Sequence, residues 1–339
     1  MFDDRMPAGG VTLLITLSLA LAGPAHALEL ERCILDGSGG ITAVEARCGW
    51  LSRPENPEQP DGVSIDLRIA VIPALSPNPQ PDALTVINGG PGGSSIDMYA
   101  DMAGTFAAIR RERDILILDQ RGTGDSNPLD CERLEQADLD QNEASVREAT
   151  LACLEDLPGD PRFYTTSVAV QDLEAARQAL GYSTLNVYGV SYGTRVAQHY
   201  TRRFPDRVRT LIIDGVAPPE IPLGPNAALN AQETLSRLFE RCRADDACAE
   251  QFPDLEDQLE SLDRRLDEEP VSVTVAHPVT GSRTTLEVTR THLLITLRML
   301  SYAPETARLI PLILDEAGNN DNFVPLASNA LRIEQQLTG

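Results

Sequence analysis

One serine in the chain lies between two glycines, at a predicted turn from a strand into a helix. Residues 189–193 read Gly-Val-Ser-Tyr-Gly. β-favouring residues precede this segment from position 185, and apolar residues at near-helical spacing follow it. A G-x-S-x-G sequence on such a turn strains the serine backbone and lifts the hydroxyl clear of the sheet, and the glycines leave room for neighbouring backbone. The residue types and their spacing therefore predict that Ser191 is a nucleophile.

A glycine-rich segment follows another predicted strand. Residues 83–87 form a short apolar run, and residues 88–95 then read Asn-Gly-Gly-Pro-Gly-Gly-Ser-Ser. Backbone N–H groups of such a loop can meet a developing oxyanion. A phosphate-binding loop would need a lysine in G-x-x-x-x-G-K-[ST], and the chain contains no lysine. Paired with Ser191, the segment predicts an oxyanion hole rather than a merely flexible loop.

A third polar segment, residues 119–126, reads Asp-Gln-Arg-Gly-Thr-Gly-Asp-Ser and follows an apolar run at 114–118. It forms either the wall of the same crevice or an ordinary turn, and the residue types favour the turn. Together the three segments lie at the carboxyl ends of predicted strands, where active residues of a parallel sheet gather.

The elements around these segments alternate between strand and helix. Strands are predicted at 63–72, 83–87, 114–118, 185–190 and 208–213, and helices at 143–156 and 167–180, the second with Ser167 as N-cap and Gly181 as C-cap. The expected fold class is α/β, with a largely parallel sheet covered by helices. Residues 28–60, rich in Gly and then Pro, are expected to form an irregular segment pinned by a disulfide.

The character of the sequence changes at Pro218. Beyond it, helices are predicted at 227–243, 255–267, 292–301, 305–317 and near the C-terminus, with one hairpin at 271–289. We expect a core at 28–217 and a helical cap or lid region at 218–339, joined by a linker at 218–225.

The first 27 residues have the features of a signal peptide. Arg5 precedes an apolar run at 11–22, and Ala25-His26-Ala27 is a cleavage signature, so export to the periplasm or medium is expected. An uncleaved membrane anchor is the alternative. The six cysteines agree with export, and short loops favour three disulfides between sequence neighbours: Cys33–Cys48, Cys131–Cys153 and Cys242–Cys248.

Composition excludes several classes of partner. The formal net charge is −23, with 51 acidic and 28 basic residues among 339, which argues against nucleic acid and anionic membranes. No C-x-x-C occurs and no histidine neighbours the cysteines, so no metal site is predicted. No cofactor is implied.

Three motifs in this order resemble the α/β-hydrolase fold peptidases of the prolyl and tripeptidyl aminopeptidase type. The motifs are residues 88–95, 119–126 and 189–195, and the sequence from Asp214 to the Cys242…Cys248 pair resembles the start of that family's cap. The resemblance spans roughly residues 63–253. Many relatives have His where this chain has Asn88, and the exported tripeptidyl branch tolerates Asn. The resemblance implies a secreted serine exopeptidase acting on free N-termini, with oxyanion donors at the backbone N–H groups of Tyr192, Gly89 and Gly90.

The chain departs from that pattern in its histidines. The fold orders its triad as Ser, then acid, then His, on loops after later strands. His26 is removed with the signal peptide. His199 lies about 12 Å along the helix from Ser191, which is beyond hydrogen-bond reach. His277 and His292 belong to the cap. We therefore expect the chain to end inside the cap, short of the strands that carry the acid and the base, and the sheet to expose an apolar edge.

Three functions remain open from the sequence. The first is an exported serine aminopeptidase that uses Ser191 on peptide substrates. The second is an exported esterase with the same elbow and oxyanion loop. The third is a catalytically inactive hydrolase-like binding protein, which the missing acid and histidine favour.

Overall fold

The computed structural model describes residues 28–37, 42–131, 143–222, 224, 226–278 and 280–338. The predicted signal peptide lies outside this range. A seven-stranded sheet has the order β1-β2-β3-β5-β4-β6-β7. The strands are β1 (Glu31–Asp36), β2 (Ala43–Pro54), β3 (Ser64–Ile72), β4 (Ala83–Ile87), β5 (Ile115–Leu118), β6 (Leu185–Val190) and β7 (Val208–Asp214).

The sheet is mixed: the strand predicted at 63–72 is antiparallel to its neighbours, and the later predicted strands form the parallel part. Strands β5, β4, β6 and β7 are neighbours and run parallel, whereas β1, β2 and β3 continue the sheet beyond β5 with antiparallel pairing. The parallel strands are joined by helical crossovers, which is the arrangement that alternating strands and helices favour. Their carboxyl ends consequently meet at one edge of the sheet.

The prediction of an irregular segment at 28–60 is wrong. This stretch forms β1 and β2, and Cys33 pairs opposite Ala46 in the ladder. The small side chains Ala46 and Cys48 are buried against the helix layer, while β2 also pairs with β3. Small residues give a weak hydrophobic alternation, so the glycines and prolines around them dominate the sequence pattern.

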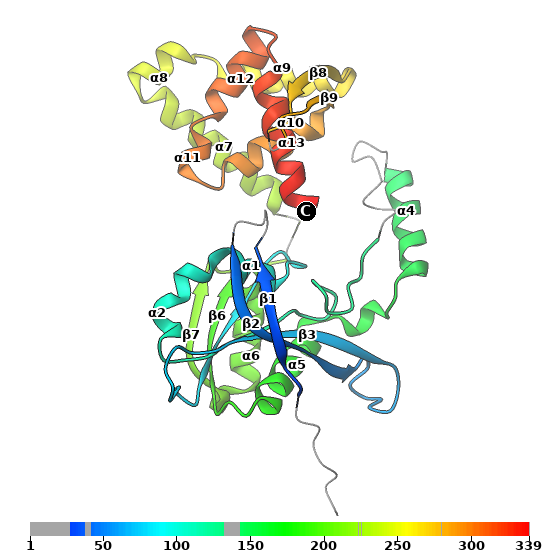
Figure 1. Cartoon of the computed structure of the whole chain (residues 1–339). Coiled ribbons are helices and arrows are strands. Elements are labelled where there is room, and N and C mark those ends of the chain that lie inside the picture. Colours follow the sequence, from blue (N-terminus) through cyan, green and yellow to red (C-terminus); the bar gives the residue numbers. More distant parts are fainter. Residues whose placement is uncertain are drawn as a thin grey trace, which may run out of the picture.

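Helices cover both faces of the sheet. One layer contains α1 (Ser95–Met102), η1 (Ala103–Phe106) and α2 (Ala107–Arg110), and the other contains α5 (Thr166–Ala179) and α6 (Tyr192–Arg203) (Figure 1). The short helices η2 (Pro161–Phe163) and η3 (Pro205–Arg207) precede α5 and β7. The predicted helix over 167–180 begins slightly earlier, because Thr165 rather than Ser167 is the N-cap; Gly181 follows it with φ +76°.

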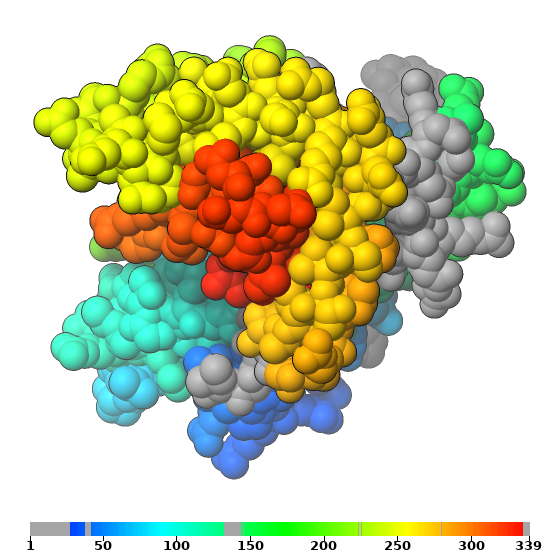
Figure 2. All heavy atoms as spheres, turned by 90° about the horizontal axis from the view of Figure 1, so that it is seen from above, coloured from blue at the N-terminus to red at the C-terminus, as the bar shows by residue number. Residues whose placement is uncertain are grey.

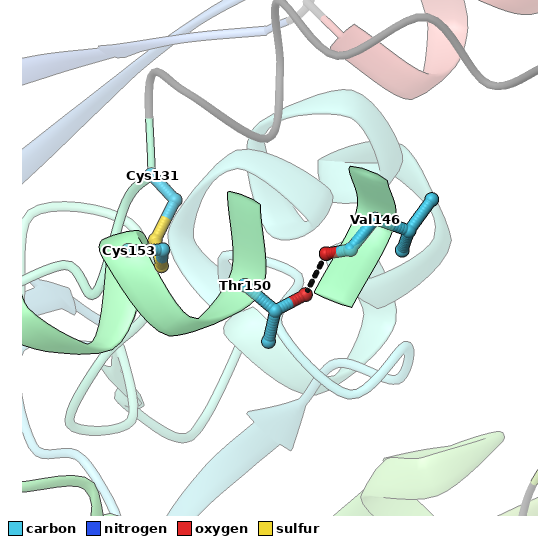
Figure 3. Close-up of a disulfide and its surroundings, with 4 residues drawn as sticks. All are labelled: Cys131, Val146, Thr150 and Cys153. Carbon is cyan, nitrogen blue, oxygen red and sulfur yellow. Dashed lines mark hydrogen bonds between the residues drawn. A yellow bond between two sulfur atoms is a disulfide. The ribbon is translucent and has the colours of Figure 1, made fainter. Parts of the chain in front are cut away.

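The helix α4 (Glu143–Asp156), predicted at these residues, stands apart from the sheet (Figure 1). A disulfide between Cys131 and Cys153 ties it to the end of the 119–131 segment, and the Thr150 hydroxyl donates 2.7 Å to the Val146 carbonyl oxygen one turn earlier (Figure 3). All three cysteine pairs lie at disulfide distance with the pairing that the sequence predicts.

The C-terminal region is a helical unit with one hairpin. Its elements are α7 (Ala227–Arg243), α8 (Asp246–Gln251), α9 (Leu255–Glu268), β8 (Val271–Ala276), β9 (Arg283–Val288), α10 (Arg290–Leu300), α11 (Pro304–Ala307), α12 (Ile310–Asn319) and α13 (Val324–Thr338). The one helix predicted over 305–317 is two helices, because Pro311 has no backbone N–H and starts a new one.

This C-terminal region packs around its own hydrophobic cluster, which includes Leu262, Leu297 and Leu314. The two clusters that flank the sheet share no residue with it. The region lies above the sheet in Figure 1, and from above it covers much of the sheet domain (Figure 2). We refer to it as the cap; the domain boundary at residue 218 stays a prediction.

Strand β7 is an edge strand with exposed apolar side chains. Leu211 is 37% exposed, Ile212 47% and Ile213 37%. The expected apolar edge is therefore present, and such an edge is a template for pairing with another chain. None of the described helices is both long and apolar enough to cross a membrane.

Candidate active site

Ser191 occupies the sharp turn between β6 and α6. Its backbone has φ +52° and ψ −120°, a conformation that residues other than glycine seldom adopt, and its side chain is exposed. The Ser191 carbonyl oxygen accepts hydrogen bonds from the Thr194 N–H, at 3.0 Å, and from the Thr194 hydroxyl, at 2.6 Å. The first turn of α6 thus holds the strained residue in place, with the hydroxyl accessible.

The two glycines of the turn are required by close backbone contacts. A Cβ atom on Gly193 would lie 2.2 Å from the carbonyl oxygen of Ile87, at the end of β4. A Cβ atom on Gly189 would lie 2.4 Å from the carbonyl oxygen of Gly193. Both distances are shorter than any real carbon–oxygen contact, so side chains are excluded on both sides of Ser191, as the sequence motif predicts.

The glycine-rich segment after β4 lies directly against the serine. A Cβ atom on Gly89 would lie 2.7 Å from the Ser191 Cβ and 3.1 Å from its hydroxyl oxygen. The structure therefore brings together the two segments that the sequence predicts to cooperate. Gly89 has to be a glycine because Ser191 occupies the space that a side chain would need.

Asn88 organises this loop in a way that the sequence analysis missed. Its side-chain oxygen accepts the Gly89 N–H at 2.6 Å, and its side-chain amide donates to the Ser94 carbonyl oxygen at 2.8 Å. The Gly89 N–H is therefore already satisfied. In the described structure the N–H groups of Gly90 and Tyr192 carry no such hydrogen bond, and Tyr192 is the first residue of α6. Of the three predicted oxyanion donors, these two are available.

The segment after β5 fixes the far side of the glycine loop. Oδ1 of Asp119 accepts hydrogen bonds from the Ser94 hydroxyl and from the N–H groups of Ser95 and Ile96, at 2.8 to 3.0 Å. Asp119 thereby caps α1, the helix into which the glycine loop leads. Burial raises the pKa of Asp119 to about 6 despite these hydrogen bonds.

Arg121 anchors the same segment to α5. Its guanidinium donates to both carboxylate oxygens of Asp172, at 2.7 and 3.0 Å, and to the carbonyl oxygen of Glu55 at 2.7 Å. Both side chains are 1% exposed. Such a buried, bidentate ion pair restricts the movement of the loop that carries Arg121.

Residues 119–126 also form the wall of a crevice. A pocket of about 230 Å³ is lined by Pro91 of the glycine loop, Thr123 of this segment, and Thr166 and Tyr192 of the two helices. The two interpretations left open by the sequence therefore both hold: the segment is a tight turn, and it lines a hollow that reaches the residue after Ser191.

The described histidines form hydrogen bonds with residues other than Ser191. His199, further along α6, contacts Arg202, with 3.2 Å between Nδ1 and Nη2, and burial together with nearby arginines lowers its pKa. His277 accepts the Thr280 N–H at 3.3 Å, and His292 caps α10 with Thr289. His26 lies outside the described residues. A base for Ser191 is thus not found among the described histidines.

Asp214 is the last residue of β7 and the acidic residue nearest in the ladder to the Ser191 turn. Its Oδ2 accepts the Tyr188 hydroxyl at 2.8 Å, and its side chain is exposed. No hydrogen bond joins this carboxylate to a histidine within the described structure. The same part of the chain contains no group of three or more metal-ligating side chains.

A strained serine elbow against a glycine loop, on a parallel sheet, is the geometry of one large fold family, and residues 82–336 match the alpha/beta hydrolase fold family. The chain belongs to that family. It is 29% identical over 221 residues to a tripeptidyl aminopeptidase of Streptomyces lividans, covering 60% of this chain and 41% of that protein.

Two further relatives bear different names. Serine protease Hip1 of Mycobacterium tuberculosis is 31% identical over 191 residues, covering 51% of this chain and 36% of the relative. Carboxylesterase B of the same species is 34% identical over 195 residues, covering 52% and 37%. The hydrolase therefore spans about two fifths of the length of these relatives.

Proposed function

We propose that this α/β-hydrolase is an exported serine peptidase that cleaves short peptides from free N-termini, with Ser191 as its nucleophile. The observation that supports this most is the geometry of Ser191: an exposed hydroxyl on a strained turn, against Gly89, with the N–H groups of Gly90 and Tyr192 unengaged. The relatives named tripeptidyl aminopeptidase and serine protease support peptides as the substrate class.

In the proposed reaction, the Ser191 oxygen attacks the scissile carbonyl carbon while a general base takes the hydroxyl proton. The carbonyl π electrons move onto oxygen, and the N–H groups of Gly90 and Tyr192 stabilise that oxyanion, with the start of α6 adding a favourable dipole. Collapse of the intermediate expels the amine, which takes a proton, and leaves an acyl-serine that water hydrolyses. The base and its orienting acid are not assigned to residues of this chain.

Export is part of the proposal. It is supported by the signal-peptide features of residues 1–27, by three cysteine pairs at disulfide distance and by the export expected for the resembling family. N-terminal sequencing of the protein isolated from its native host should begin at Leu28. A native N-terminus at Met1 would contradict the cleavage.

The substrate class is tested with protein from the native host on three kinds of substrate: peptide amides with free N-termini, the same peptides with blocked N-termini, and simple acyl esters. We expect rapid cleavage of the free peptides alone, and no cleavage by Ser191→Ala. Equal rates on free and blocked peptides would contradict the aminopeptidase. Cleavage of esters only would favour the second candidate, an esterase, which the similarity to carboxylesterase B supports. Binding of peptides without turnover would favour an inactive binding protein.

A further inference from the structure

A pocket in the cap carries a positive charge that nothing in the proposed reaction uses. It has a volume of about 350 Å³ and lies between the linker after β7, the first turns of α7 and the end of α10. Its walls include Ile221 of the linker, Asn226 and Asn230 at the start of α7, and Arg298 and Tyr302 at the end of α10. No acidic residue is among the described residues that line it.

Arg298, in the last turn of α10, supplies the positive charge of this pocket. It is half-buried, and within the described structure its guanidinium forms no ion pair and no hydrogen bond. Arg290, on the same helix, pairs with Asp263 at 2.8 Å. In a chain with a net charge of −23, an arginine that faces a pocket without carboxylates is available for an anion from outside.

The other polar groups of the pocket suit a carboxylate that is held by an arginine. The side-chain amides of Asn226 and Asn230 and the hydroxyl of Tyr302 can donate hydrogen bonds, and none of them is engaged within the described structure. A carboxylate accepts up to four such bonds, two of them from one guanidinium. Because the whole protein repels anions, binding depends on this local cation.

The pocket is linked to the nucleophile through Arg195. This residue lies one turn after Ser191 on α6, and its Nη2 donates to the carbonyl oxygens of Pro218 and Ile221, each at 2.6 Å. Arg195 therefore joins the helix that begins beside Ser191 to the linker residues that form one wall of the pocket.

We propose that this cap pocket binds the carboxylate group of a short peptide through Arg298, and so selects ligands by their negative charge. The proposal rests on the proposed function, since it names a recognition element for the same peptides. Two sources of that carboxylate are distinguishable: the C-terminus of the peptide and an acidic side chain.

The test measures binding by calorimetry at low ionic strength, in the Ser191→Ala protein so that no ligand is consumed. The ligands are trialanine, trialanine amide and Ala-Ala-Asp amide. We expect trialanine to bind at least about tenfold more tightly than its amide, as a charge-assisted hydrogen-bonded pair predicts. Restored affinity with Ala-Ala-Asp amide would identify a side-chain carboxylate as a second source.

Arg298→Gln should remove the preference for carboxylates, whereas Arg290→Gln on the same helix should keep it. Arg298 lies in the last turn of α10, where a cation also favours the helix dipole; loss of that role changes the melting temperature but not the ratio of affinities. Equal affinity for acid and amide, a preference that survives Arg298→Gln, or no measurable binding would each overturn the proposal. If the wild-type protein hydrolyses no peptide while Ser191→Ala keeps its preference for carboxylates, the peptidase proposal is overturned and the pocket proposal is not.

Discussion

The backbone N–H of Ser191 donates a 2.9 Å hydrogen bond to the carbonyl oxygen of Asp214, the last residue of β7. The neighbouring residue Thr194 extends this connection, because its hydroxyl oxygen accepts the Ala217 N–H at 2.8 Å. The turn that carries the proposed nucleophile is therefore closed by the end of β7 and the residues that follow it toward the cap. A displacement of these residues would directly shift the backbone of Ser191.

Two substitutions of Ser191 distinguish the backbone strain of the turn from the role of the hydroxyl. Ser191→Ala and Ser191→Gly both remove the hydroxyl, and we expect neither to hydrolyse substrate. Glycine adopts φ +52° without strain, so Ser191→Gly should be more stable than Ser191→Ala by about 1 kcal/mol. Urea unfolding followed by the fluorescence of Trp50, the single tryptophan, measures the difference. Equal stabilities would mean that the turn is not strained.

Asp119 should make stability depend on pH. Burial raises its pKa from 3.8 to about 6, so the folded state keeps a proton that the unfolded state has lost. Its contribution is fully present below pH 3.8 and is lost as the pH rises through 6, by about 3 kcal/mol. The unfolding free energy of Asp119→Asn, measured relative to wild type, should therefore increase over this range. A pH-independent difference for Asp119→Asn would contradict the raised pKa.

Asp172 should be among the most sensitive acidic residues of the core. Asp172→Ala leaves the guanidinium of Arg121 buried without its partner, which costs about 3–5 kcal/mol. The matched control is Glu233→Ala, which removes the exposed partner of Arg237 and should cost under about 1 kcal/mol. Circular dichroism follows the unfolding of both variants. Similar losses in the two would show that the Arg121 pair does not anchor the crevice wall.

The edge strand β7 should govern self-association. Ile212→Lys places a charge on this edge, where lysine blocks strand pairing. We expect less light scattering on concentration than for wild type. Leu229→Lys is the control, since Leu229 is 64% exposed but lies on helix α7. If both substitutions reduce scattering equally, general solubility rather than the strand edge is responsible.

The local part of the site was predictable from sequence. The residue types themselves determine the geometry of the turn at Ser191 and of the glycine loop, because only glycine fits the contacts at Gly89 and Gly193. Strand β4 is predicted at its exact bounds, since a short apolar run between turn signals has few alternatives.

The parts that depend on distant contacts were not predictable. The bonds from Asn88 to its own loop require the loop conformation to be known first. The pairing of Arg121 with Asp172 joins residues 51 apart in sequence. Strand β1 pairs with β2, and β2 pairs with β3, so both strands gain their stability from pairing rather than from their own pattern. Tertiary structure, not local preference, decides these features.

The hydrophobic cluster of the cap shares no residue with the clusters on the two faces of the sheet. Substitutions inside the cap can therefore accumulate over evolution without loosening the turn that holds Ser191. Descendants of such a chain are free to acquire new ligand preferences by remodelling residues 227–338 while they inherit the same serine turn. The sheet domain keeps the serine turn, and the cap is where new ligand preferences can arise.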